Sequence, residues 1–234
     1  MRKILIALLI VAAAAIAVVA YREWQPGSKT AATPAGGQAS EAKPFTVTAD
    51  DRVLGSPDAP VTVIEYASMT CPHCAHFDVE ILPQIKSTLI DSGKARLVFR
   101  DFPLDGLALR GAMLVRCVGN DRAFGMIDLL FSRQAQWAGA QDPIAALGTI
   151  AAQAGMSGDD FKACVENQTV LNAVVQSRTD AENTYGINST PSFLINGQLV
   201  VGAYEAPEFI KMVEAAAAGA PAAPTSSSPS TPAR

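Results

Sequence analysis

Two cysteines separated by two residues, Cys71 and Cys74, are the part of the sequence best suited to chemistry. They follow an apolar run typical of a buried strand and open a segment with helical spacing. At a helix start, free backbone N–H groups and the helix dipole stabilise negative charge, so we expect Cys71 to ionise below the usual thiol pKa. Such a thiolate attacks disulfides and also leaves readily. The spacing therefore predicts dithiol–disulfide exchange, with Cys71 as the nucleophile and Cys74 as the buried resolving thiol.

Other uses of a Cys-x-x-Cys pair fit the sequence less well. A structural zinc site needs four ligands, but the two further cysteines stand alone, and the only histidines, His73 and His76, lie beside the pair. Covalent haem attachment needs His directly after the second Cys, where this chain has Ala75. A purely structural disulfide stays open, although the strand-then-helix context favours redox chemistry. We expect neither a metal nor a cofactor.

The segment Thr70-Cys71-Pro72-His73-Cys74 and the downstream segment Ser189-Thr190-Pro191 together carry a family resemblance. They resemble the DsbA-like periplasmic disulfide oxidoreductases of the thioredoxin superfamily, over residues 45–218. The resemblance implies an α/β, thioredoxin-like fold with a mixed central sheet and an inserted helical subdomain.

Length, charge and cysteine count agree with an exported single domain. The chain of 234 residues is long enough for one well-buried domain with additional segments. Its net charge of −4, without a basic cluster, gives no indication of nucleic-acid binding. Its four cysteines, an even number, fit two disulfides and an oxidising compartment.

The two ends of the chain differ in composition from the middle. Residues 1–20 begin with Met1-Arg2-Lys3 and continue as an apolar run, which predicts an export signal that is either cleaved or retained as a membrane anchor. Both outcomes place the domain outside the cytoplasm, and the resemblance implies the periplasm. Residues 21–44 are rich in Pro, Gly, Ala and Ser and predict a flexible linker. Residues 219–234 predict a disordered tail.

Four segments of the domain have strand character. Residues 45–47 predict a short edge strand, and residues 61–67 predict a central strand buried on both faces. Residues 95–102 predict a second main strand, parallel to the first. Residues 192–201 predict a β-hairpin around Asn196-Gly197.

The remaining segments have helical character. Residues 71–90 predict the crossover helix between the two main strands, kinked at Pro83. Residues 104–186 lack a convincing strand and predict a helical insertion, which the DsbA-like proteins carry at the same place. A last helix should begin near Ala206 and pack its apolar side on the domain.

The central strand contains an acidic residue, Glu65, among apolar neighbours. A carboxylate is costly to ionise there, so its pKa should be raised. From the residues alone, a core carboxyl held by local hydrogen bonds remains an alternative. The resemblance favours a proton exchanger near Cys74, because the family carries an acidic residue six positions before its first active-site cysteine.

The resemblance also assigns roles to the residues around the pair. It implies a cis bond between Thr190 and Pro191, in a loop that faces the cysteines and binds an extended substrate. Of the two residues between the sulfurs, Pro72 and His73, the histidine would stabilise the Cys71 thiolate and make the disulfide oxidising. The alternative for His73 is an exposed loop residue without a role.

Cys117 and Cys164 both fall in the predicted helical insertion. Two buried, reduced cysteines are one reading, since unpaired thiols pack well in cores. Export to an oxidising space favours a bond, and some DsbA-like proteins carry a second disulfide in this insertion. We therefore expect a structural disulfide between the two.

The activity implied by the resemblance is the introduction of disulfide bonds into unfolded or reduced exported proteins. A DsbB-like, quinone-linked membrane protein would reoxidise the enzyme, which we expect to act as a monomer. Thr190 is also common before the proline in isomerase branches, so isomerase and reductase activities remain alternatives. A tethered, non-catalytic, chaperone-like binding module is an alternative of another class, against which the intact cysteine pair argues.

Overall fold

The computed structural model describes residues 42–219. The predicted export segment (1–20), nearly all of the predicted linker (21–41) and the tail (220–234) lie outside the described residues. Within the described part, no helix is long and apolar enough to cross a membrane.

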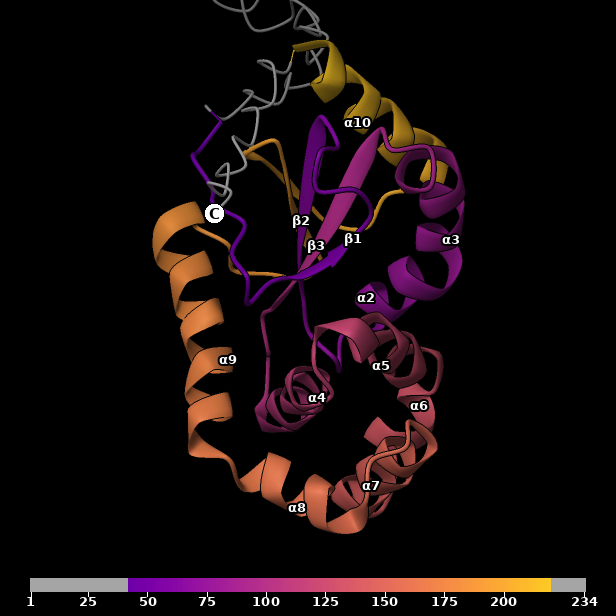
Figure 1. The fold of residues 1–234 in the computed structure, drawn as a ribbon, viewed down its shortest axis with the longest axis vertical. Helices are drawn as coiled ribbons and strands as arrows, with labels where there is room; N and C mark the ends of the chain where they lie inside the picture. The colour runs from indigo at the N-terminus through magenta and orange to yellow at the C-terminus, as the bar shows by residue number, and fades with distance from the viewer. Residues whose placement is uncertain (1–41, 220–234) are drawn as a thin grey trace, which may run out of the picture. The chain divides into compact units, whose positions relative to one another are not determined.

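A mixed five-stranded sheet forms the centre of the domain (Figure 1), in the order β1-β3-β2-β4-β5. The predicted parallel pair is β2 (Val61–Ala67) and β3 (Ala95–Asp101). The predicted hairpin is β4 (Ser192–Ile195) and β5 (Gln198–Val201), and β4 pairs antiparallel with β2. The edge strand β1 (Arg52–Leu54) pairs antiparallel with β3. The predicted fold class is therefore confirmed.

The edge strand predicted at residues 45–47 is wrong, because the strand β1 lies seven residues further on. A turn separates the two segments: the backbone N–H of Thr48 donates to the Asp51 carboxylate, and that of Asp51 donates to the Thr48 carbonyl. Phe45 and Val47 are half-buried against an apolar cluster on the sheet. The alternation of apolar Phe45 and Val47 with polar Thr46 reflects this packing and not strand pairing.

The predicted crossover helix contains two wide turns. It runs as α2 (Pro72–His76), a π-helical turn η1 (Phe77–Ile81), α3 (Leu82–Ile85) and a second π-helical turn η2 (Lys86–Ile90). Pro83 lies in α3, between the two π-helical turns. Because proline lacks the N–H that an interior α-helical turn needs, the regular hydrogen-bond ladder is interrupted around it.

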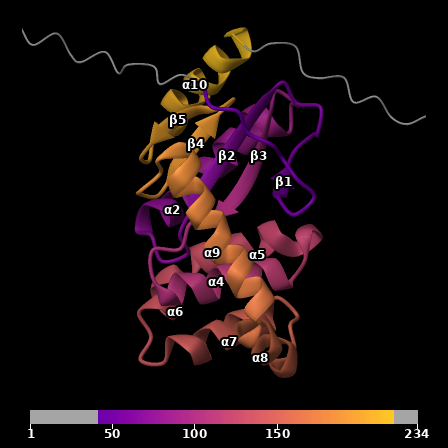
Figure 2. The same cartoon turned by 90° about the vertical axis from the view of Figure 1, so that its left-hand side faces the viewer.

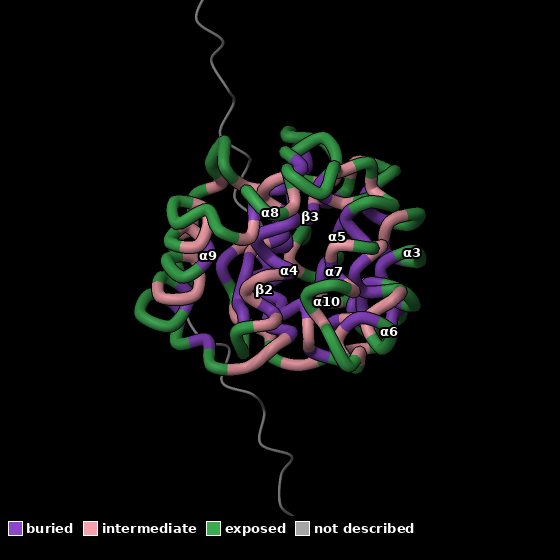
Figure 3. The backbone as a smooth tube through the Cα atoms, turned by 90° about the horizontal axis from the view of Figure 1, so that it is seen from below, coloured by how far each residue is buried: buried purple, intermediate pink, exposed green. Residues whose placement is uncertain are grey.

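Apolar residues cover both faces of the sheet, and Figure 3 shows the buried residues gathered inside the exposed outer turns. On one face, Phe77, Phe193 and Phe209 of the last helix, α10 (Ala206–Gly219), form an aromatic cluster with ring centroids 4.7–5.4 Å apart. On the other face, the π-helical turn η3 (Ala181–Tyr185) packs its tyrosine ring near Tyr66, with centroids 6.1 Å apart.

The predicted helical insertion follows β3 and lies mostly beyond one end of the sheet, with its last helix running back across the sheet (Figure 2). Aspartate or serine side chains cap several of its helices, as at Asp105, Asp142 and Ser157. Its helices are α4 (Gly106–Cys117), α5 (Asn120–Ser132), α6 (Gln134–Ala138), α7 (Pro143–Gln153), α8 (Gly158–Glu166) and α9 (Gln168–Asp180). The left-handed Gly186, at φ 72°, ends the segment.

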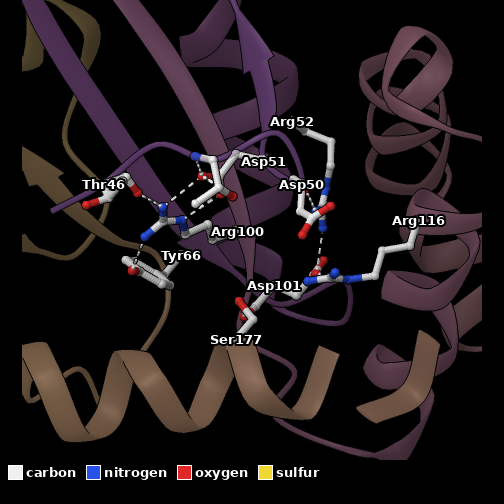
Figure 4. A network of polar contacts seen from close by, with 10 residues as sticks. Thr46, Asp50, Asp51, Arg52, Tyr66, Arg100, Asp101, Arg116 and Ser177 are labelled. Atoms are coloured by element: carbon white, nitrogen blue, oxygen red, sulfur yellow. Dashed lines mark hydrogen bonds and ion pairs between the residues drawn. The ribbon is translucent and has the colours of Figure 1, made fainter. Parts of the chain in front are cut away.

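A polar network on the sheet face near α9 ties the insertion to the sheet (Figure 4). The fully buried Asp101 accepts from Arg52 at 2.6 Å and from Arg116 of α4 at 2.7 Å, and its backbone carbonyl accepts from Ser177 of α9. Because α4 and α9 both contact Asp101, this network holds the two helices against the end of β3. Removing one partner would leave a buried charge uncompensated.

A disulfide links two helices of the insertion. Cys117, the last residue of α4, is bonded to Cys164 of α8, with Cα atoms 6.0 Å apart. This distance lies within the range that a disulfide spans without backbone movement. The insertion therefore has a covalent connection of its own, separate from the Cys71–Cys74 pair.

This disulfide should resist reductants that open the active-site pair, because Cys117 is the last residue of α4 and Cys164 lies inside α8, so neither sulfur is at a helix start where a leaving thiolate is stabilised. Thiol counting after mild reduction should find two free thiols, and four only after denaturation with reductant. Replacing both Cys117 and Cys164 by alanine should lower the free energy of unfolding by up to about 4 kcal/mol, since the bond closes a long loop. Four thiols after mild reduction of the folded protein would contradict this.

Candidate active site

The two active-site cysteines lie at the junction of β2, α2 and the helical insertion. Cys71 is the N-cap residue of α2. It has an extended backbone and is 6% exposed. Pro72 is the first helical residue, where its missing N–H costs nothing. Cys74 is fully buried inside the helix. This arrangement presents Cys71 to a partner and keeps Cys74 behind it.

Several donors converge on the sulfur of Cys71 and lower the pKa of its thiol to about 5. The largest contribution is a hydrogen bond from the Cys74 thiol, which outweighs the opposing effect of burial. The Thr190 hydroxyl and the backbone N–H groups of Cys74 and His73 add to it. Cys71 is therefore ionised at neutral pH.

The loop before β4 lies against Cys71. The Thr190–Pro191 peptide bond is cis, as the resemblance implied. The Cys71 sulfur lies 3.4 Å from the Thr190 carbonyl oxygen, to which it donates only when it is protonated. The geometry thus brings Cys71 together with Thr190 and Pro191, although Thr190 lies 119 residues further along the chain.

Glu65 lies in an apolar part of the sheet. It is 1% exposed, and its neighbours on the adjacent strands are Phe99 and Phe193. Its Oε1 atom has no hydrogen-bond partner within residues 42–219, which argues against a carboxyl held by local hydrogen bonds. Burial, then the charges of Asp78 and Cys71, raise the pKa of Glu65 well above its ordinary value.

Cys74 responds to the same surroundings in the opposite sense to Cys71. Burial raises the pKa of its thiol, and its hydrogen bond to Cys71 and the charge of Glu65 raise it further. Cys74 is therefore a protonated thiol when the pair is reduced. The two sulfurs consequently differ in protonation state, which is what a nucleophile and a resolving thiol require.

The side chain of His73 is exposed, and the part of this residue that acts on Cys71 is its backbone N–H. A role for its imidazole stays a prediction. His76 is also exposed, and its Nε2 lies 3.8 Å from the carboxylate of Glu205. Across residues 42–219 no cluster of His, Cys, Asp or Glu is placed to hold a metal ion.

Gln134, a residue that the sequence did not single out, holds the active-site loop from the helical insertion. Its side-chain amide donates to the carbonyl of Met69 at 2.9 Å and to that of Cys71 at 3.0 Å. Both bonds cross more than 60 residues of sequence, between α6 and the loop before α2. No local signal in the sequence could have identified this contact.

A second clamp holds the same loop from the start of α4. Thr70 donates through its hydroxyl to one carboxylate oxygen of Asp105, at 2.6 Å. The other oxygen of Asp105 caps α4 by accepting from two backbone N–H groups. Ser68 accepts from the backbone N–H of Leu104 at 3.2 Å. The helical insertion therefore fixes the backbone on which Cys71 sits.

The sequence also resembles known proteins over most of this domain. The thioredoxin family profile matches residues 47–215. The chain is 31% identical to the solved structure of Wolbachia pipientis alpha-DsbA1. The match covers 75% of this chain and 94% of the Wolbachia chain, with a TM-score of 0.70. The chain belongs to the DsbA-like branch of the thioredoxin family.

Further relatives of this DsbA-like chain are disulfide oxidoreductases by name. A Rickettsia bellii protein provisionally named protein-disulfide oxidoreductase is 29% identical over 70% of this chain and 67% of its own length. The chain spans only 55–57% of the length of four other Rickettsia relatives. A structure of a protein-disulfide isomerase from Novosphingobium aromaticivorans is 25% identical, with a TM-score of 0.64, and covers 75% of this chain and 98% of its own.

In the reduced protein, iodoacetamide should modify Cys71 before Cys74. Because the thiolate is the nucleophile, the rate should reach half of its maximum near the Cys71 pKa of about 5 and stay constant above it. Mass spectrometry after labelling between pH 3 and pH 8 measures both. Preferential labelling of Cys74, or a midpoint near the ordinary thiol value of about 8.5, would falsify the assignment.

Replacing Gln134 by leucine should loosen the active-site loop, since the carbonyls of Met69 and Cys71 lose their donor. We expect a loss of about 1–3 kcal/mol in the free energy of unfolding and a higher alkylation midpoint for Cys71. Gln136→Leu, an exposed glutamine on the same helix, is the matched control and should change neither. If both variants behave alike, Gln134 does not position the loop.

Proposed function

We propose that this protein is a thiol:disulfide oxidase that introduces disulfide bonds into reduced, unfolded exported proteins. The observation that carries the proposal is the low pKa of Cys71, about 5. A stabilised thiolate favours the reduced form of the pair, so the Cys71–Cys74 disulfide readily gives up its bond to another dithiol.

The proposed reaction has two exchange steps. A client thiolate attacks the sulfur of Cys71, the Cys71–Cys74 bond breaks, and the sulfur of Cys74 takes a proton from the carboxyl of Glu65. A second client thiolate then attacks the client sulfur of the mixed disulfide, and Cys71 leaves as its stabilised thiolate. The client gains one disulfide and the enzyme is left reduced.

Substrate binding is proposed at the loop that contains Thr190 and Pro191. The Thr190 carbonyl lies beside Cys71, so an extended client segment bound there would bring its sulfur to the nucleophile. Because the enzyme ends each cycle reduced, it requires an oxidant. We assign this role to a DsbB-like, quinone-linked membrane protein, and we place the reaction in the periplasm with the enzyme acting as a monomer.

Isomerase activity is the second candidate. It is favoured by Thr190 in front of the cis proline and by the name of the Novosphingobium relative. An isomerase acts on clients that already carry incorrect disulfides, whereas an oxidase transfers its own. The two activities can therefore be separated with one client protein in two starting states.

The oxidised protein should rapidly introduce disulfides into reduced, unfolded ribonuclease A and should restore little activity to scrambled ribonuclease. Acid-quenched mass spectrometry and ribonuclease activity measure the two outcomes. Cys74→Ala should accumulate mixed disulfides with the client because Cys71 stays reactive, and Cys71→Ala is the matched control that should not. Efficient recovery of scrambled ribonuclease by the reduced protein would assign it to the isomerases instead.

A further inference from the structure

A cavity of about 660 Å³ lies between α9 and the sheet, bounded also by the segment 44–52. Successive side chains of a strand point to opposite faces, so Tyr66, which lines the cavity, points away from the face that Glu65 occupies. None of the residues that line the cavity belongs to the active site described above. Its volume falls in the range of small-molecule binding sites.

Two arginines line one end of this cavity. Figure 4 shows Arg52 and Arg116 converging on the carboxylate of Asp101. The side chain of Arg52 is 3% exposed and that of Arg116 is 18% exposed, while Asp101 is fully buried. Two guanidinium groups therefore face one carboxylate, which leaves one positive charge in excess at this end.

The same end of the cavity has more hydrogen-bond donors than acceptors. The buried Nε of Arg52 has no partner among residues 42–219, and Arg116 uses only its Nε in this range, so both of its terminal nitrogens can bond a ligand. The hydroxyl of Tyr66 accepts from Arg100 and donates to no residue that the structure describes. Because polar groups inside proteins are rarely left without a partner, this surplus of donors indicates a ligand that accepts hydrogen bonds.

The remaining charges around the cavity limit the charge of such a ligand. Arg100 makes two bonds of 2.8 Å to Asp51, so this pair adds no net charge. Asp50 and Asp180 also line the cavity, and both are exposed to solvent. They would repel a second negative charge, so one carboxylate fits the cavity better than a phosphate dianion.

Part of the cavity wall is aromatic. Tyr66 and Tyr185 lie with their ring centroids 6.1 Å apart, and the half-buried Phe45 lines the same wall. Aromatic rings offer apolar area to a planar ligand and pack against it at an offset or an edge. The lining thus combines a cationic end with an aromatic wall.

We propose that this cavity binds a small molecule with one carboxylate and an aromatic body. The carboxylate accepts from the two terminal nitrogens of Arg116, since a guanidinium group donates two parallel bonds to a carboxylate. The body extends along the sheet toward Tyr66. The proposal does not depend on the exchange reaction, because the cavity and the cysteine pair share no residue.

The test is a calorimetric titration of the full chain with 2-naphthoate and, separately, with 2-naphthamide, which has the same body without the charge. We expect saturable, one-to-one binding of 2-naphthoate. The amide should bind at least about tenfold more weakly, because it cannot form charge-assisted bonds with Arg116.

Three variants locate the site. Arg116→Gln should weaken the binding of 2-naphthoate by about 10- to 100-fold. Arg122→Gln, an exposed arginine outside the cavity, is the matched control and should leave the affinity unchanged. Asp180→Asn removes a repelling charge from an exposed position, so it should tighten the binding of 2-naphthoate a few-fold and leave that of the amide unchanged.

No saturable binding of 2-naphthoate at millimolar concentrations overturns the proposal, and so does an equal affinity for the acid and the amide. Equal affinities of Arg116→Gln and the unmodified protein would also overturn it. If Arg116→Gln does not fold, an unchanged affinity in Asp180→Asn overturns it instead. Protection of Cys71 from alkylation by 2-naphthoate would place the ligand at the active site and contradict the proposal.

Discussion

The stabilisation of one thiolate, that of Cys71, is the interaction on which the rest of the site depends. Donors from Cys74, Thr190 and the first turn of α2 lower its pKa to about 5. Because the folded pKa is depressed, the reduced fold gains stability relative to the unfolded chain as pH rises from about 5 to the ordinary thiol value, and loses it as pH falls through 5. The disulfide form has no thiolate and gains no such stability, so the folded structure favours reduction of the pair.

The same surroundings must keep every other nearby group uncharged, since additional negative charge would oppose the thiolate. Burial achieves this for Cys74 and Glu65 by raising their pKa values well above the ordinary ones. The helical insertion supplies the rigidity, through Gln134 and through Asp105 on either side of the loop. The site is thus one ionised sulfur beside a thiol and a carboxyl that are held neutral.

The sequence predicted the parts of the structure that local rules determine. The two parallel strands, the hairpin around Asn196-Gly197 and the helical insertion follow from periodicity and turn residues, and all are present. The strand at residues 45–47 was wrong because its alternation serves packing on the sheet. Cys71 and Cys74 were evident from spacing, and Thr190 and Pro191 from family resemblance. Gln134 was not, because it acts through a contact 63 residues away.

The equilibrium between the Cys71–Cys74 disulfide and the glutathione couple at pH 7 tests the central claim most directly, because the thiolate stabilisation appears in it as a reduction potential. If Cys71 is held as a thiolate, the potential should lie above about −180 mV, on the oxidising side of protein disulfide isomerase. A potential near about −270 mV, the value for thioredoxin, would mean that the surroundings of Cys71 do not stabilise its charge.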